Sequence, residues 1–259
     1  IKKKKEDISI PYEMGKVYKS IQDALRVLKV NQFRIENGKF TLVNKVQPGQ
    51  LPLIIGDIHF QIDNLQVDPG TLSGKEKLLF SDNVVLRSNN QNILFPDGRH
   101  RLSFSRFRIN LQRKLVEFDS CTIAATKKDS AGSSFNVFFN KLLLTNIDFD
   151  TLYRAEVIKA DSVYCVNPKF TLDVDLDKNK GAKKSPPKLE RIVEQLTGDL
   201  QLGYVVVENA DFDIRTSRNG KPSSFIFSKN SFEMQGLSVN QEAAKPITVK
   251  SFAMAIRNY

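Results

Sequence analysis

A six-residue pattern recurs along the chain and constrains its fold more than any other feature. It consists of an apolar residue, a polar residue, then Asn, Ser or Gly, two variable positions and a second apolar residue. The steps from Ile35 to Ile62, from Phe118 to Leu144 and from Val207 to Met234 are 26 or 27 residues, and the step from Ile62 to Phe118 is 56, about twice that distance. The sequence is therefore a β repeat. The copies begin at Ile35, Ile62, Phe118, Leu144, Ala160, Val207 and Met234.

Apolar and polar residues alternate along most of the chain, as in Phe170-Thr-Leu-Asp-Val-Asp-Leu176, which predicts half-buried antiparallel strands. The two apolar positions of the pattern are offset by five, an odd number that turns them to opposite faces of a regular strand. A β-bulge restores the same face, and Asn, Ser or Gly suits its bridge or left-handed conformation. A two-residue hairpin turn would suit Asn37-Gly38 but not Asn64-Leu65. We therefore predict bulged strands.

Two segments have the apolar spacing of a helix, and we expect short helices at 13–28 and 187–197. A shift of 172 residues places Ile35 on Val207, Asn37 on Asn209 and Phe40 on Phe212. A helix-plus-strand unit is thus duplicated at about 13–45 and 185–217. The polar stretch at 177–184, between the copies, is predicted to be an exposed loop, because strand patterns flank it on both sides. We expect one elongated, repeat-built β domain over residues 1–259, as a segment of a longer protein.

Ten or more amphipathic strands present an apolar surface that two short helices do not cover. We expect a mainly β fold, a long and strongly twisted antiparallel sheet that curls into an open groove. A closed β-sandwich is the alternative, because a second sheet also buries such a face.

The charge balance is basic, 39 Lys and Arg against 29 Asp and Glu, which favours polyanions or anionic membrane surfaces as neighbours. The run Lys2, Lys3, Lys4 and Lys5 is a candidate contact for phospholipid headgroups, with a solvated terminus as the plainer interpretation. No apolar stretch approaches the length of a membrane span. We expect no nucleic-acid partner, because no recognition signature accompanies the basic residues.

Nothing in the sequence predicts catalysis, a cofactor or a metal site. The histidines His59 and His100 stand far apart, and Cys121 and Cys165 match neither a metal spacing nor a disulfide framework. Both thiols are expected to be free, because at least one strand separates them in sequence order. We therefore do not expect an enzyme.

The segments from Leu28 to Leu42 and from Leu200 to Ile214 carry the motif most fully, around Ile-Glu-Asn-Gly and Val-Glu-Asn-Ala. In these segments the chain resembles the AsmA-like family and, more broadly, the repeating β-groove, bridge-like lipid-transfer proteins. The resemblance implies a half-pipe with an apolar concave face, located in the periplasm and anchored to the inner membrane. Because the family's usual N-terminal membrane helix is missing from this sequence, the anchor is expected outside it.

This interpretation predicts a groove that binds or conducts phospholipid or other acyl chains between membranes, or supports envelope integrity. The alternative is a structural or assembly module that binds envelope proteins, for example by adding a strand to a sheet edge. The candidate groove residues are Phe33, Ile35, Phe40, Leu42, Phe60, Ile62 and Phe212.

Overall fold

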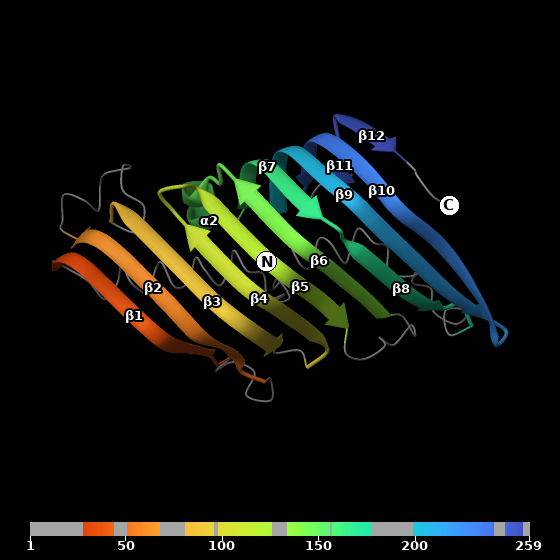
Figure 1. Cartoon of the computed structure of the whole chain (residues 1–259), viewed down its shortest axis with the longest axis horizontal. Helices are drawn as coiled ribbons and strands as arrows, with labels where there is room; N and C mark the ends of the chain where they lie inside the picture. The colour runs from red at the N-terminus through yellow and green to blue at the C-terminus, as the bar shows by residue number, and fades with distance from the viewer. Residues whose placement is uncertain are drawn as a thin grey trace, which may run out of the picture.

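A computed structural model describes residues 28–43, 51–67, 81–95, 98–125, 134–155, 157–177, 199–240 and 247–255. Within these ranges the chain forms twelve strands and one short helix, α2 (Phe149–Ala155). Figure 1 shows the long strands lying side by side and curving along their length. The strands are β1 (Leu28–Leu42), β2 (Leu53–Val67), β3 (Asn83–Leu94), β4 (His100–Asn110), β5 (Leu115–Ala125), β6 (Ser134–Thr145), β7 (Val157–Val166), β8 (Lys169–Asp175), β9 (Asp199–Arg218), β10 (Lys221–Val239), β11 (Ile247–Thr248) and β12 (Ser251–Ala255).

All twelve strands belong to one sheet, in the order β1-β2-β3-β4-β5-β6-β7-β9-β10-β11. The short strands β7 and β8 share one place in this order, because both pair with β6 on one side and with β9 on the other. Similarly, β12 pairs with β10 beside β11. The sheet is mixed, since β7 and β8 run parallel to β9 while the other pairs are antiparallel.

The left-handed conformation expected at the third position is present in most copies of the sequence pattern, and the copies at Ile35 and Val207 also carry the register shifts of β-bulges. Six of the seven third positions have positive φ, between 47° and 62°. The exception is Ser162, whose hydroxyl lies 2.5 Å from the Thr145 hydroxyl on the neighbouring strand. The copy at Leu144 differs in another way, because Asn146 ends the strand and the chain then enters α2. The third positions with positive φ are Asn37, Asn64, Ser120, Asn146, Asn209 and Gly236.

The strand pairings place many of the positive-φ residues in one line across the sheet, which we call the kink line. Between the pairs Ile35–Phe60 and Phe40–Ile55, the register shifts twice. First β1 carries one residue more than β2, and then β2 carries one residue more than β1. Two compensating bulges therefore keep Ile35 and Phe40 on the same face, although they are an odd number of positions apart. The kink line consists of Asn37 on β1, Asp57 on β2, Asn90 on β3, Ser120 on β5, Asn167 after β7, Asn209 on β9 and Lys229 on β10.

The hairpin of β9 and β10 repeats the geometry of β1 and β2. Asn209 and Lys229 lie 172 positions after Asn37 and Asp57, and both pairs carry positive φ at register shifts. The turn of the second hairpin is Asn219-Gly220, with φ of 52° and 70°, as a type I′ turn requires. The shift of 172 residues thus relates two strand pairs. The residues aligned in the sequence, such as Asn37 and Asn209, belong only to the first strand of each pair.

The main core lies beneath α2, where Phe149 and Leu152 pack against strand residues such as Ala160 and Val163. Asp148 precedes the helix and caps it, because its carboxylate accepts bonds from the backbone N–H and the hydroxyl of Thr151 at 3.0 and 2.7 Å. These bonds hold the pKa of Asp148 below its ordinary value. The sequence analysis missed this helix, because seven residues are too few for a helical apolar period.

The mainly β, open and twisted sheet expected from the sequence is confirmed. The described strands do not form the two facing sheets of a closed sandwich, and the expectation of a wholly antiparallel sheet is wrong at β7, β8 and β9. The helices expected at 13–28 and 187–197 lie outside the described residues, except that Leu28 begins strand β1.

Candidate functional site

One face of the sheet is apolar across its whole width, and we call it the apolar face. A row of paired residues crosses from β1 to β12, and every member of it is apolar. Cross-strand partners project from the same face of a sheet, so these side chains form a continuous band. The row is Ile35, Phe60, Leu86, Ile109, Val116, Leu144, Val163, Val205, Met234 and Phe252.

The predicted groove residues all lie on this apolar face, but they differ in exposure. Phe33 and Ile35 on β1 keep 43% and 39% of their surface exposed. Ile62 on β2 is 6% exposed and belongs to the main core, so it is not accessible to a ligand. Half-buried positions are taken by Phe40, Leu42, Phe60 and Phe212. The residues Lys2, Lys3, Lys4 and Lys5 lie outside the described part of the chain.

Aromatic rings continue the apolar face at the β12 end of the sheet. The ring of Phe212 lies 6.3 Å from that of Phe170 and 6.4 Å from that of Phe232, and the ring of Phe232 lies 6.0 Å from Phe252. Phe252 and Met254 remain 58% and 45% exposed. The sequence analysis did not select these two residues, although their spacing of two in a short apolar run indicates one strand face.

A second cluster, made of aromatic rings and thiols, lies on the apolar face near the kink line. Phe107 contacts Phe118 at 4.5 Å between ring centroids, and both contact Phe104. Cys121 and Cys165 are free thiols, as expected, and β6 lies between their strands. Burial raises the pKa of each thiol to about 12. Both cysteines are therefore packing residues and not nucleophiles.

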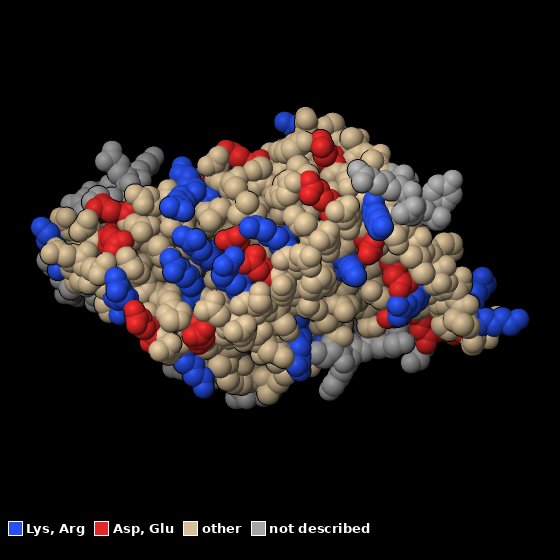
Figure 2. Space-filling model, viewed as in Figure 1, with Lys and Arg blue, Asp and Glu red and all other residues tan. Residues whose placement is uncertain are grey.

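The opposite face, which we call the polar face, carries the charged side chains. Arg106 binds Asp119 at 2.5 Å, and Lys141 binds Glu117 at 2.8 Å. The bond from Lys141 holds the pKa of Glu117 below its ordinary value. Figure 2 shows Lys and Arg side chains gathered over the middle strands, with acidic side chains between them. The sheet is therefore amphipathic, with apolar and ionic surfaces back to back.

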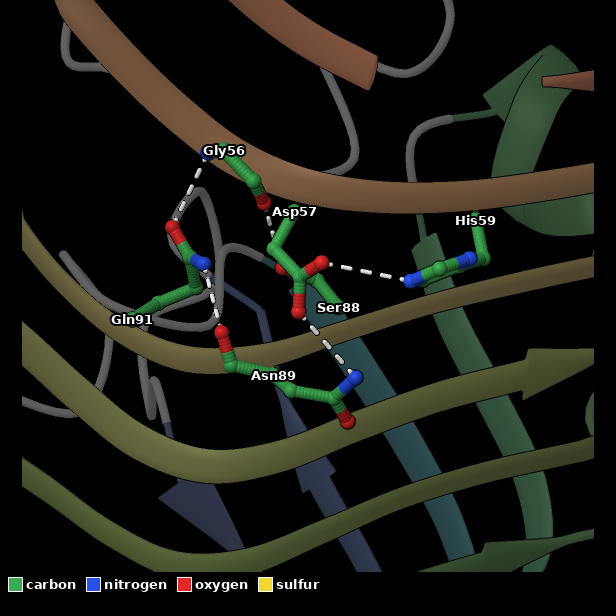
Figure 3. A network of polar contacts seen from close by, with 6 residues as sticks. All are labelled: Gly56, Asp57, His59, Ser88, Asn89 and Gln91. Atoms are coloured by element: carbon green, nitrogen blue, oxygen red, sulfur yellow. Dashed lines mark hydrogen bonds and ion pairs between the residues drawn. The ribbon is translucent and has the colours of Figure 1, made fainter. Parts of the chain in front are cut away.

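A polar network holds β2 to β3 where the kink line crosses them (Figure 3). The backbone pairing of these strands ends at Ile58–Ser88, and side chains then replace it. Gly56 donates its N–H to Gln91 at 2.9 Å and accepts the Ser88 hydroxyl at 2.9 Å. On the polar face, Asp57 accepts a bond from Asn89 at 3.2 Å. These contacts satisfy backbone groups that the bulge leaves unpaired.

The carboxylate of Asp57 also lies 3.2 Å from Nε2 of His59, and both side chains are partly exposed. The hydroxyl of Ser88 in the same network donates its bond to the Gly56 carbonyl. Among the described residues, no group of three or more His, Cys, Asp or Glu side chains is arranged to hold a metal ion. In the same part of the chain, no helix is long and apolar enough to cross a membrane.

Sequence comparison adds no relative to this picture. No protein-family model matches the chain, and no curated protein shows significant similarity to it. The functional argument therefore depends on the geometry of the sheet and its two faces.

Proposed function

We propose that the chain is a periplasmic β-groove segment of an AsmA-like protein, which binds or conducts the acyl chains of phospholipid between membranes or supports envelope integrity. The observation that carries this proposal is the uninterrupted apolar row from Ile35 to Phe252. The row is exposed at its two ends, at Ile35 and Phe252, and buried in its middle, at Ile109, Val163 and Val205. Exposed apolar side chains at both ends of one apolar face indicate an apolar partner.

The physical basis of the binding is the non-directional burial of methylene groups. Each acyl CH₂ removed from water contributes about 0.8 kcal/mol, and it needs no hydrogen-bonding group from the protein. The exposed side chains on the apolar face supply only aliphatic and aromatic surface, which suits this ligand. Phe33, Ile35, Phe252 and Met254 mark the two ends of the band, where a chain would enter or leave.

The proposal also includes the anchoring of the protein to the inner membrane through a segment outside this chain. It assigns no catalytic step and no cofactor. The polar face would remain in water or contact envelope proteins, while the apolar face shields the lipid.

Lipid binding is tested with a fluorescent phospholipid and the variant Phe33→Asp. A carboxylate at this exposed position obstructs an acyl chain, because its desolvation costs several kcal/mol, and we expect binding to fall at least tenfold. The matched control is Thr41→Asp, which adds the same charge to the same strand on the polar face. Equal binding by wild type and Phe33→Asp, with the fold intact, would reject the proposal and favour the assembly module.

A further inference from the structure

Three neighbouring strands bring basic side chains together on the polar face. Arg87 on β3 is the direct partner of His59 on β2 and of Arg108 on β4. Arg106 lies two residues from Arg108 on the same strand face. Like charges directly opposite each other destabilise an antiparallel pair. The Arg87–Arg108 pair therefore costs folding free energy unless an anion compensates it.

The nearby carboxylates are engaged with other side chains. Asp57 contacts His59, Asp119 contacts Arg106, and Glu117 contacts Lys141. Glu117 is the strand partner of Arg108 and is influenced by its charge, but it forms no ion pair with it. Within the described part of the chain, neither Arg87 nor Arg108 forms a hydrogen bond or an ion pair.

Arg108 has a further unusual property. Its Nε atom is buried and has no hydrogen-bond partner among the described residues. A buried donor without a protein partner is uncommon in folded proteins, and an ordered water or a bound ion accounts for such donors. The guanidinium of Arg87, in contrast, is exposed and accessible from the solvent.

We propose that Arg87 and Arg108 bind a phosphate group on the polar face, with Arg106 and His59 at its rim. The two guanidinium groups come from directly paired positions on adjacent strands, and phosphate is an anion that guanidinium forks bind bidentately. The Nε–H of Arg108 would gain its missing acceptor. This site lies on the face opposite the apolar row, so it does not depend on the proposed lipid groove.

The test follows the Nε–H resonances of the arginines while inorganic phosphate is added. We expect saturable shifts for Arg87 and Arg108, and no such shifts with sodium chloride at equal ionic strength. Arg87→Gln, at an exposed position, should lower the phosphate affinity about tenfold or more. The matched control is Arg101→Gln on β4, which removes an exposed arginine bonded to Asn92 and should change the affinity less than twofold.

Vesicles distinguish a lipid phosphate from a soluble one. If vesicles of phosphatidic acid bind wild type but not Arg87→Gln, the phosphate belongs to a membrane lipid. Binding of inorganic phosphate without vesicle binding identifies a soluble ligand. The proposal is overturned if phosphate and chloride act alike, or if Arg101→Gln weakens binding as much as Arg87→Gln. Phe33→Asp should leave phosphate binding unchanged, which separates this test from that of the lipid groove.

Discussion

At the scale of single residues, the kink line shows how side-chain chemistry sets the path of a strand. A left-handed φ costs most L-residues roughly 1–2 kcal/mol, and Asn and Asp tolerate it best because their side chains bond locally. Five of the seven residues on the kink line are Asn or Asp, and Ser120 and Lys229 are the others. Their φ values, between 46° and 55°, let the strands bend while the apolar side chains stay on one face.

Substitution of the kink-line asparagines should measure this cost. Asn37→Ala and Asn209→Ala are each expected to lower the free energy of unfolding by about 1 kcal/mol, while Asn37→Gly changes it by only a few tenths. The control is Asn136→Ala on β6, an exposed asparagine outside the positive-φ set, for which we expect less than about 0.5 kcal/mol. Urea unfolding curves give these values, and a loss at Asn136 equal to that at Asn37 would contradict the account.

The buried thiols make a pH-dependent prediction. With pKa values of about 12 in the folded protein against 9.0 for an ordinary thiol, Cys121 and Cys165 hold almost no thiolate at pH 8. Alkylation of the native protein should therefore be on the order of a thousandfold slower than that of the urea-unfolded chain.

The folded state raises these pKa values. The contribution of the thiols to the free energy of unfolding is therefore fully present below pH 9 and is lost as the pH rises towards 12. The urea midpoint should fall over this interval, and Cys121→Ala with Cys165→Ala should reduce the fall. Rapid labelling of native protein at pH 8 would show that the thiols are exposed.

At the scale of strands, the least predictable feature is the parallel contact of β7 with β9. It requires Gly203, because a Cβ at this position would stand 2.7 Å from the backbone oxygen of Asp161. The neighbouring pairs Ala160–Leu202 and Val163–Val205 then bring buried apolar residues together across the two strands. Close approach at one glycine thus allows β7 to pair with β9, and this pairing and that of β8 with β9 join the second hairpin to the rest of the sheet.

Gly203→Ala should disturb the pairing of β7 with β9, because the clashing oxygen of Asp161 belongs to the backbone and cannot rotate away. We expect a loss of about 1–3 kcal/mol in the free energy of unfolding. Gly56→Ala is the matched control, because its Cβ would meet only the Gln91 side chain at 3.9 Å, so its effect should stay within about 1 kcal/mol. Thermal melts of both variants give the comparison, and equal stability would show that the β7–β9 approach is looser than described.

The features that sequence predicted are those encoded locally. Strand alternation and the left-handed Asn and Ser positions each follow from the chemistry of a few neighbouring residues. The parallel pairing of β9 depends on contacts between residues more than 40 positions apart, which periodicity does not encode. For the same reason, alternation placed Ile62 and Phe33 on one face but did not show that only Phe33 stays exposed.

At the scale of the whole molecule, the sheet carries apolar side chains on one face and charged side chains on the opposite face. The apolar face carries the uninterrupted row from Ile35 to Phe252, and the polar face carries the ion pairs and the arginines of the proposed phosphate site. Adjacent residues of one strand therefore face different surroundings, as Phe33 and Arg34 do on β1. The proposed lipid binding depends on this back-to-back arrangement, because it requires that only one face contacts acyl chains.

The most direct test is photo-crosslinking in cells with a benzoylphenylalanine probe placed at Phe33, Ile35 or Arg34. The account predicts lipid adducts, identified by mass spectrometry, at Phe33 and Ile35 and their absence at Arg34, although the three positions are consecutive or nearly so on one exposed strand. Equal lipid labelling at all three positions, or protein adducts alone at Phe33 and Ile35, would contradict it.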